Sequence, residues 1–293
     1  MKTLVAGWFS FEHMGASAGD LLARDVVCGW FEEAGQDYEV ALAPPFEGGV
    51  RWEKRKPEDY DRVVFVCGPF GNGPPVDRFL QHFSGCELIG VNLSMLEPLE
   101  VWNPFDLLLE RDSSAASRPD LTMLSTGRLV PVVGLVLIDE QPEYGESDLR
   151  KLANDAFDRL IASRPMSVVR IDTRLDVNST GLRTASEVES LIARMDVVLT
   201  TRLHGLVLAL KNGVPAIAID SVAGGHKVSR QAETLGWPHV FRADELDEKA
   251  LQRAFRLCLQ DETRDEARAC RTRAMAKLQN VRDEVVRRLE RVS

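Results

Sequence analysis

The chain has 293 residues, of which 44% are apolar and 28% are charged, and its formal net charge is −9 at pH 7. This length allows two domains with separate cores, and the composition is that of a soluble globular protein. The acidic balance argues against non-specific binding to nucleic acid, because that binding depends on cations that neutralise phosphates.

Cysteine usage and hydropathy also limit the class of protein. The five cysteines are scattered and lack CxxC spacing, so we expect neither a disulfide framework nor a structural metal site. The apolar run from Thr3 to Phe9 is too short for a signal peptide, and the longest apolar runs are far shorter than a membrane span. We therefore expect a cytoplasmic protein.

The first half of the chain alternates between predicted strands and glycine-containing loops. Strands are expected at Lys2 to Phe9, Tyr38 to Ala43, Asp61 to Cys67 and Cys86 to Leu93. The loop after the first strand leads into a helix that begins near Gly19 and Asp20 and ends near Gly35. Such a loop can present backbone N–H groups to an anion, although it is neither a GxGxxG fingerprint nor a P-loop. Asp20 is equally consistent with a favourable charge at a helix N-terminus. The polar segment from Glu47 to Tyr60 is expected at the surface.

A change of composition marks a boundary between domains. The segment from Ser113 to Pro131 is rich in Ser, Thr, Pro and Arg, which is typical of a connection. We therefore predict one domain over residues 1–120 and a second over residues 121–293.

The second half continues the alternation of strands and helices. We expect strands at Val132 to Ile138, Ser167 to Asp172, Val197 to Thr200, Val214 to Asp220 and Val240 to Ala243, and helices at Ser147 to Ala162, Val188 to Met195, His204 to Lys211 and Asp247 to Leu259. This order predicts two α/β domains with Rossmann-like, mostly parallel sheets that face a cleft.

A long amphipathic helix is predicted from Thr263 onward, because apolar residues recur there every three or four positions. The stripe contains more small residues than leucines. We therefore expect the helix to pack back on the first domain rather than to form a coiled coil.

The loop after the predicted strand Val197 to Thr200 carries Arg202 and His204. Ligands of open parallel sheets bind at the carboxyl ends of strands. A forked cation two residues from an imidazole suits an anionic substrate that needs a proton moved. From spacing alone, a helix-start ion pair and a surface histidine would explain the two residues about as well.

The surrounding residues provide a more specific signal. The segment from Asp196 to Pro215, with Arg-Leu-His-Gly at Arg202 to Gly205, resembles the signature of the polysaccharide pyruvyl transferase family. Shorter segments also resemble the family pattern: Gly19-Asp20 at a helix start, Gly68 in a glycine turn after a strand, Arg111-Asp112, and Lys227 after a later strand.

The resemblance implies a GT-B-like fold and a transferase that moves a pyruvyl group from phosphoenolpyruvate to a sugar-type acceptor, often as a ketal. It implies that the first domain binds the acceptor and the second the donor. Arg202 would bind the anionic donor and His204 would act as the general acid. The expected substrate-binding residues are Lys227, Arg174, Gly19, Asp20, Gly68 and His226. No cofactor and no metal are expected, since phosphoenolpyruvate is the donor and no His/Asp cluster at ligand spacing is present.

Two other interpretations stay open. A glycosyltransferase on the same architecture would use Arg202 and Lys227 to bind the diphosphate of a nucleotide sugar. A non-catalytic or repurposed family member is consistent with two altered loops. The loop Ala16 to Ala18 replaces the family's asparagine-glycine, and the turn Gly68 to Gly73 replaces three consecutive glycines.

Overall fold

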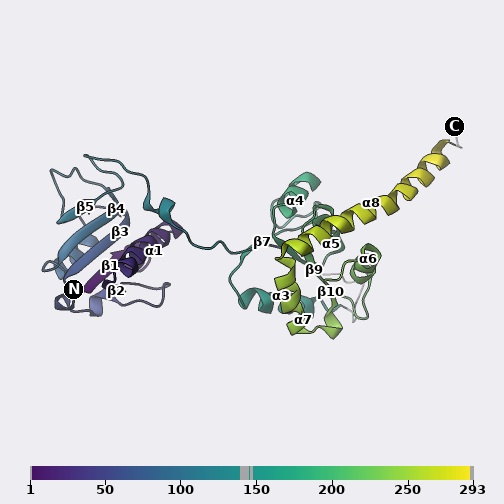
Figure 1. Ribbon diagram of the computed structural model, residues 1–293, viewed down its shortest axis with the longest axis horizontal. Helices are drawn as coiled ribbons and strands as arrows, with labels where there is room; N and C mark the ends of the chain where they lie inside the picture. The colour runs from purple at the N-terminus through teal and green to yellow at the C-terminus, as the bar shows by residue number, and fades with distance from the viewer. Residues whose placement is uncertain (1, 139–144, 146–147, 291–293) are drawn as a thin grey trace. The chain divides into compact units, whose positions relative to one another are not determined.

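The computed structural model describes residues 2–138, 145 and 148–290. The chain divides into two compact units, Met1–Arg128 and Leu129–Ser293 (Figure 1). The sequence analysis had placed the boundary between domains after residue 120. Each unit contains a five-stranded sheet whose strands all pair in parallel. The prediction of two parallel-sheet α/β domains and a long C-terminal helix is therefore confirmed, while a cleft between the units stays a prediction.

The N-terminal sheet has the strand order β2-β1-β3-β4-β5. Its elements are β1 (Lys2–Gly7), α1 (Ala18–Glu33), β2 (Asp37–Val40), β3 (Arg62–Phe70), α2 (Val76–His82), β4 (Glu87–Met95) and β5 (Leu107–Leu109). Successive side chains of a strand point to opposite faces. Val5 and Val64 accordingly lie in the cluster that includes residues of α1, while Leu4 and Phe65 lie in an aromatic cluster with residues of α2. Both faces of the sheet are thus buried, as is usual for parallel sheets.

One expectation about this unit is wrong at two residues. The segment from Glu47 to Tyr60 was expected at the surface, but Trp52 and Tyr60 are buried in the aromatic cluster. Polar residues flank both rings in the sequence, so no repeating pattern of apolar residues predicted their burial. Contacts with residues distant in the chain, such as Phe79 and Phe83, bury them instead.

The predicted boundary segment is anchored to the N-terminal unit over its first half. Arg111 Nη1 lies 2.8 Å from Asp120 Oδ2, and Arg118 Nη1 lies 2.8 Å from the buried Glu110 carboxylate. Asp120 also caps the short 3-10 helix Leu121–Leu124, which packs on α1. The exposed connection therefore begins only after this helix.

Limited digestion with trypsin should first cut the central part of the chain at the Arg128–Leu129 bond. Leu129 is 91% exposed, whereas Arg118 precedes a proline and Arg111 is held by Asp120. Mass spectrometry should identify two stable fragments that end and begin at this bond. The variant Arg128→Gln should resist the cut. A first cut after Arg111 would contradict the conclusion that the first half of the boundary segment is held to the N-terminal unit.

The C-terminal sheet has the strand order β10-β9-β8-β6-β7. Its elements are β6 (Val132–Val136), α3 (Arg150–Ala162), β7 (Ser167–Arg170), α4 (Ala185–Ile192), β8 (Val197–Thr200), α5 (Leu203–Lys211), β9 (Ala216–Asp220), α6 (Lys227–Leu235), β10 (Val240–Arg242), α7 (Glu248–Cys258) and α8 (Asp261–Glu290). Residues of α3 and α7 share one core cluster, and residues of α4, α5, α6 and the start of α8 share another. Residues 146–147, at the predicted start of α3, lie outside the described residues.

Local signals define several ends of these helices. Thr184 and Glu187 form the capping box that begins α4. Gly213 follows α5 with φ +67°, a backbone conformation that favours glycine.

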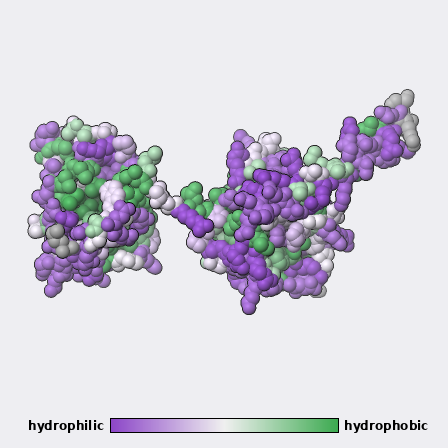
Figure 2. Space-filling view, in the orientation of Figure 1, coloured by the Kyte–Doolittle hydropathy of each residue, from purple (hydrophilic) through white to green (hydrophobic). Residues whose placement is uncertain are grey.

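Hydrophilic residues cover most of the visible face of the C-terminal unit (Figure 2).

Helix α8 packs on α5, α6 and α7 of its own unit. Its buried residues are Ala267 and Cys270, whereas Leu278 and Leu289 are exposed. Packing of this helix on the N-terminal unit stays a prediction.

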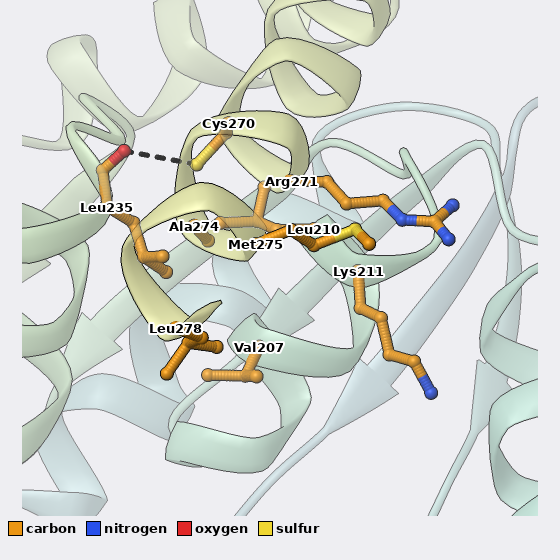
Figure 3. Close-up of a pocket in the computed structure, with 9 residues that line it drawn as sticks. All are labelled: Val207, Leu210, Lys211, Leu235, Cys270, Arg271, Ala274, Met275 and Leu278. Atoms are coloured by element: carbon orange, nitrogen blue, oxygen red, sulfur yellow. Dashed lines mark hydrogen bonds between the residues drawn. The ribbon is translucent and has the colours of Figure 1, made fainter. Parts of the chain in front are cut away.

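An apolar pocket of about 350 Å³ lies between α5, α6 and α8. Figure 3 shows its apolar side chains gathered beside α8, with Lys211 and Arg271 extending to one side. Cys270 Sγ donates to the Leu235 carbonyl at 3.2 Å, which fixes α8 to the end of α6.

Candidate functional site

The carboxyl edge of the C-terminal sheet contains a topological switch point. From β6 the chain passes to β7 on one side, whereas from β8 it passes to β9 and β10 on the other. Ligands of open α/β sheets bind where two such neighbouring strands diverge. The loop after β8 carries Arg202 and His204, so both residues lie at this position.

The turn from β8 into α5 is held by Thr200. Its hydroxyl oxygen accepts from the Arg202 N–H at 2.9 Å and lies 2.9 Å from the Val136 carbonyl oxygen, to which the hydroxyl donates. Gly205 is the residue that lets the helix close on these strands. A Cβ at position 205 would overlap the Thr200 hydroxyl and lie 2.9 Å from Val136 Cγ1.

Replacing Gly205 with alanine should therefore destabilise the protein by about 1–3 kcal/mol, the usual cost of overpacking a core. Gly29, inside α1, is the matched control, because a Cβ there meets no atom within 4 Å. Gly29→Ala should stabilise the protein by about 0.5–1 kcal/mol through its effect on helix entropy. Chemical denaturation of both variants measures the difference, and an unchanged stability of Gly205→Ala would contradict the packing argument.

Arg202 is held across the switch point. Its Nε donates to the Leu137 carbonyl at 2.6 Å, just after β6. Its Nη2 lies 3.8 Å from Asp172 Oδ1, which follows β7. The Arg202 and Asp172 side chains are only 14% and 7% exposed. Little water therefore screens this pair, and both residues are kept in a defined arrangement at the sheet edge.

Asp172 is a site residue that the sequence analysis missed. Burial alone would raise its pKa. Hydrogen bonds from the backbone N–H groups of Ser179 and Arg174, at 3.0 and 2.9 Å, outweigh burial and hold the pKa below its usual range. Asp172 is therefore a carboxylate that faces Arg202. The available signal was an acidic residue at the end of a predicted strand.

His204 occupies the first turn of α5 and is exposed. Backbone N–H groups and the positive end of the helix dipole lie at this turn, which favours an anion beside the imidazole. The loop thus provides a guanidinium that is mostly buried and an imidazole that solvent and ligands can reach.

The other substrate-binding residues predicted at this edge lie on neighbouring loops. Arg174 directs its fork at Asp176, with distances of 3.1 and 2.7 Å, and these hydrogen bonds lower the pKa of Asp176 to about 2. His226 and Lys227 begin α6, after β9. Asp220 accepts from the His226 N–H at 2.7 Å, which anchors this loop to the end of β9.

The three predicted residues of the N-terminal unit have structural contacts of their own. Asp20 accepts from the Ser17 N–H and hydroxyl, each at 2.7 Å, and so caps α1. Gly68 has φ +84°, and a Cβ there would overlap the Trp8 indole. Gly19 has room for a Cβ, which would meet Ser17 Oγ at 3.5 Å. A binding role for these three residues stays a prediction.

Within the described residues, no group of three or more His, Cys, Asp or Glu side chains could hold a metal ion. Over the same part of the chain, none of the helices combines the length and apolar content that a membrane crossing needs.

The fold and the strand-end residues define a two-unit parallel α/β protein with a candidate anion site at the switch point of its C-terminal sheet. The family model for polysaccharide pyruvyl transferase matches residues 142–221, which include Arg202 and His204. The resemblance seen in the sequence is therefore confirmed for this segment. No curated protein matches the chain at a significant level.

Several solved structures resemble the chain weakly. They include the spinosyn rhamnosyltransferase SpnG complexed with thymidine diphosphate, with 11% identity, 97% of this chain and 100% of that chain covered, and a TM-score of 0.33. The UDP-GlcNAc 2-epimerase from Methanocaldococcus jannaschii has 10% identity, coverage of 90% and 94%, and a TM-score of 0.34. MurG of Acinetobacter baumannii has 10% identity, coverage of 93% and 95%, and a TM-score of 0.32. At such scores these structures indicate nothing about what this chain binds.

Proposed function

We propose that this protein is a transferase that moves a pyruvyl group from phosphoenolpyruvate to a hydroxyl of a sugar-type acceptor. One observation carries the proposal. Within the segment that matches the pyruvyl transferase family, Arg202 is held across the switch point, two residues before the exposed His204. This arrangement supports an anionic donor and a proton transfer at the same strand end.

The chemistry assigns different tasks to these two residues. Phosphoenolpyruvate carries a carboxylate and a phosphate, and the Arg202 fork suits either group. His204 gives a proton to the methylene carbon, an acceptor hydroxyl bonds to the central carbon, and the bond from that carbon to the phosphate oxygen breaks. When a second hydroxyl closes a ketal, the two hydroxyl groups release two protons. One replaces the proton that His204 gave to the methyl group, and the other is taken up by the released phosphate.

Two further cations support binding of the donor. Lys227 begins α6 on the loop after β9, next to β8 in the sheet. Arg174 pairs with Asp176 in an exposed position, and an exposed pair contributes only about 0–1 kcal/mol. Arg174 therefore exchanges this partner for a donor oxygen at little cost.

Replacing Lys227 with alanine should weaken donor binding about 10- to 150-fold, because one charge-assisted contact is lost. The melting temperature should change little, since Lys227 is a partly exposed residue of the first helical turn. Titration calorimetry with phosphoenolpyruvate measures the affinity. Unchanged donor affinity would remove Lys227 from the site.

The proposal is tested by direct comparison of donors. Calorimetry with phosphoenolpyruvate and with UDP-glucose, followed by phosphate release with a panel of sugars, distinguishes the two chemistries. Binding of phosphoenolpyruvate and acceptor-dependent release of phosphate are expected. Binding of the nucleotide sugar alone would replace pyruvyl transfer with glycosyl transfer. Binding of neither donor would favour a repurposed protein.

A further inference from the structure

The N-terminal sheet has a switch point of its own, between β1 and β3. From β1 the chain passes to β2 on one side, and from β3 it passes to β4 and β5 on the other. Residues after these two strands and the 3-10 helix Trp52–Lys54 line an open hollow of about 510 Å³. Small-ligand pockets have volumes of roughly 300–1,000 Å³. None of Gly19, Asp20 and Gly68 lines this hollow.

Arg78 is an accessible hydrogen-bond donor of the hollow, and the ring N–H of Trp52, another lining residue, is buried; neither has an acceptor among the described residues. Arg78 is exposed, makes no side-chain hydrogen bond or ion pair in that part of the chain, and lies over the Trp52 ring with 5.9 Å between guanidinium carbon and centroid. Trp52 is only 4% exposed, and its Nε1 is a buried donor without a partner there. The accessible Arg78 guanidinium therefore favours a ligand that provides acceptor oxygens.

The hollow also contains hydrogen-bond acceptors, the carboxylates of Glu12 and Glu53. Arg51 joins two carboxylates, with Nη1 at 2.8 Å from Glu12 Oε1 and Nη2 at 3.1 Å from Glu53 Oε1. Each carboxylate has about four lone-pair positions and therefore accepts further hydrogen bonds. This triad carries one net negative charge, which Arg78 balances. Met14 and Pro74 add exposed apolar surface at the rim.

We propose that this hollow binds a sugar unit that carries a carboxylate. Arg78 binds the carboxylate, Glu12 and Glu53 accept from ring hydroxyls, and the apolar rim contacts the C–H face of the ring. The inference deepens the proposed function and rests on it for one point, the role of this sugar as the acceptor. Binding itself requires no donor and is measured without one.

The test uses the full chain and the indole N–H signals of its tryptophans in ¹H–¹⁵N spectra. The Trp52 signal is assigned with Trp52→Phe. Methyl glucuronide and methyl galacturonide should shift this signal in a saturable manner, and their neutral methyl glycosides should bind at least tenfold more weakly. The signal of Trp30, exposed on α1 and outside the hollow, should not move.

A pair of matched variants tests the role of the cation. Arg78→Gln should weaken binding of both uronides about 10- to 100-fold, the equivalent of one hydrogen bond to a charged group. Arg55→Gln removes an arginine of the same unit that pairs with Glu39 at 3.4 Å, and it should leave the affinity unchanged.

Three results would overturn the inference. They are uronides that leave the Trp52 signal unmoved, neutral sugars that bind as tightly as the uronides, and inorganic phosphate that produces the same shift and so reveals a simple anion site. A chain that binds uronides but not phosphoenolpyruvate would keep this inference and lose the proposed function. The reverse result would keep the proposed function and remove the inference.

Discussion

Replacing His204 with asparagine should lower turnover roughly 10²- to 10⁴-fold, the range that one positioned acid or base contributes. Asparagine keeps a polar side chain at the first turn of α5 but cannot act as a general acid. Donor affinity should be largely preserved, because Arg202 remains in place across β6 and β8. Phosphate release from phosphoenolpyruvate in the presence of the acceptor measures the effect.

The pH dependence gives this prediction a second readout. A general acid produces one limb of the pH profile of turnover, and the asparagine variant should lack that limb. His239→Asn is the matched control. Burial lowers the pKa of His239, and this residue contacts Trp237 rather than the switch point. Wild-type turnover in His204→Asn would exclude His204 as the acid.

Replacing Arg202 with lysine should weaken donor binding by about 1.5–3 kcal/mol, or about 10- to 150-fold in the dissociation constant. The charge is kept, but the planar fork that binds two oxygens of a carboxylate or phosphate is lost. Calorimetry with phosphoenolpyruvate measures the change. Arg159→Lys is the control, because Arg159 makes an exposed pair with Glu248 on α3 and α7.

A structural effect of the same variant must be distinguished from an effect on binding. Lysine also loses the hydrogen bond to the Leu137 carbonyl and alters the pair with Asp172. Thermal unfolding of Arg202→Lys should therefore show a modest loss of stability beside the loss of affinity. A loss of stability with unchanged donor affinity would show that Arg202 stabilises the carboxyl edge of the sheet and does not bind the donor.

The order of the elements was predictable from the sequence because each depends on local patterns. Apolar runs such as Val197–Thr200 predicted β8, and the pair Thr184 and Glu187 predicted the start of α4. Alternation of strands and helices then limits the architecture to parallel sheets. A crossover helix carries the chain back along the sheet, so the next strand runs in the same direction as the one before it. The short helix α2 was missed, since Val76–His82 spans only two turns beside two prolines.

Part of the candidate site could also be predicted. Arg202 and His204 follow one strand directly, so their place at the sheet edge depends only on recognising β8. Asp172 could not be assigned to Arg202, because β7 and β8 are separated in the sheet by β6. That partnership depends on strand order, which local periodicity does not contain.

By itself, the sequence determined the two α/β units, the long last helix, and the loop that carries Arg202 and His204, because periodicity and turn residues act over short distances. Only the tertiary structure decided that Asp172 faces Arg202, that Gly68 accommodates the Trp8 indole, and that Trp52 is buried beneath Arg78. These three relations join residues between 26 and 60 positions apart in the chain, and only packing of the completed sheets brings them together.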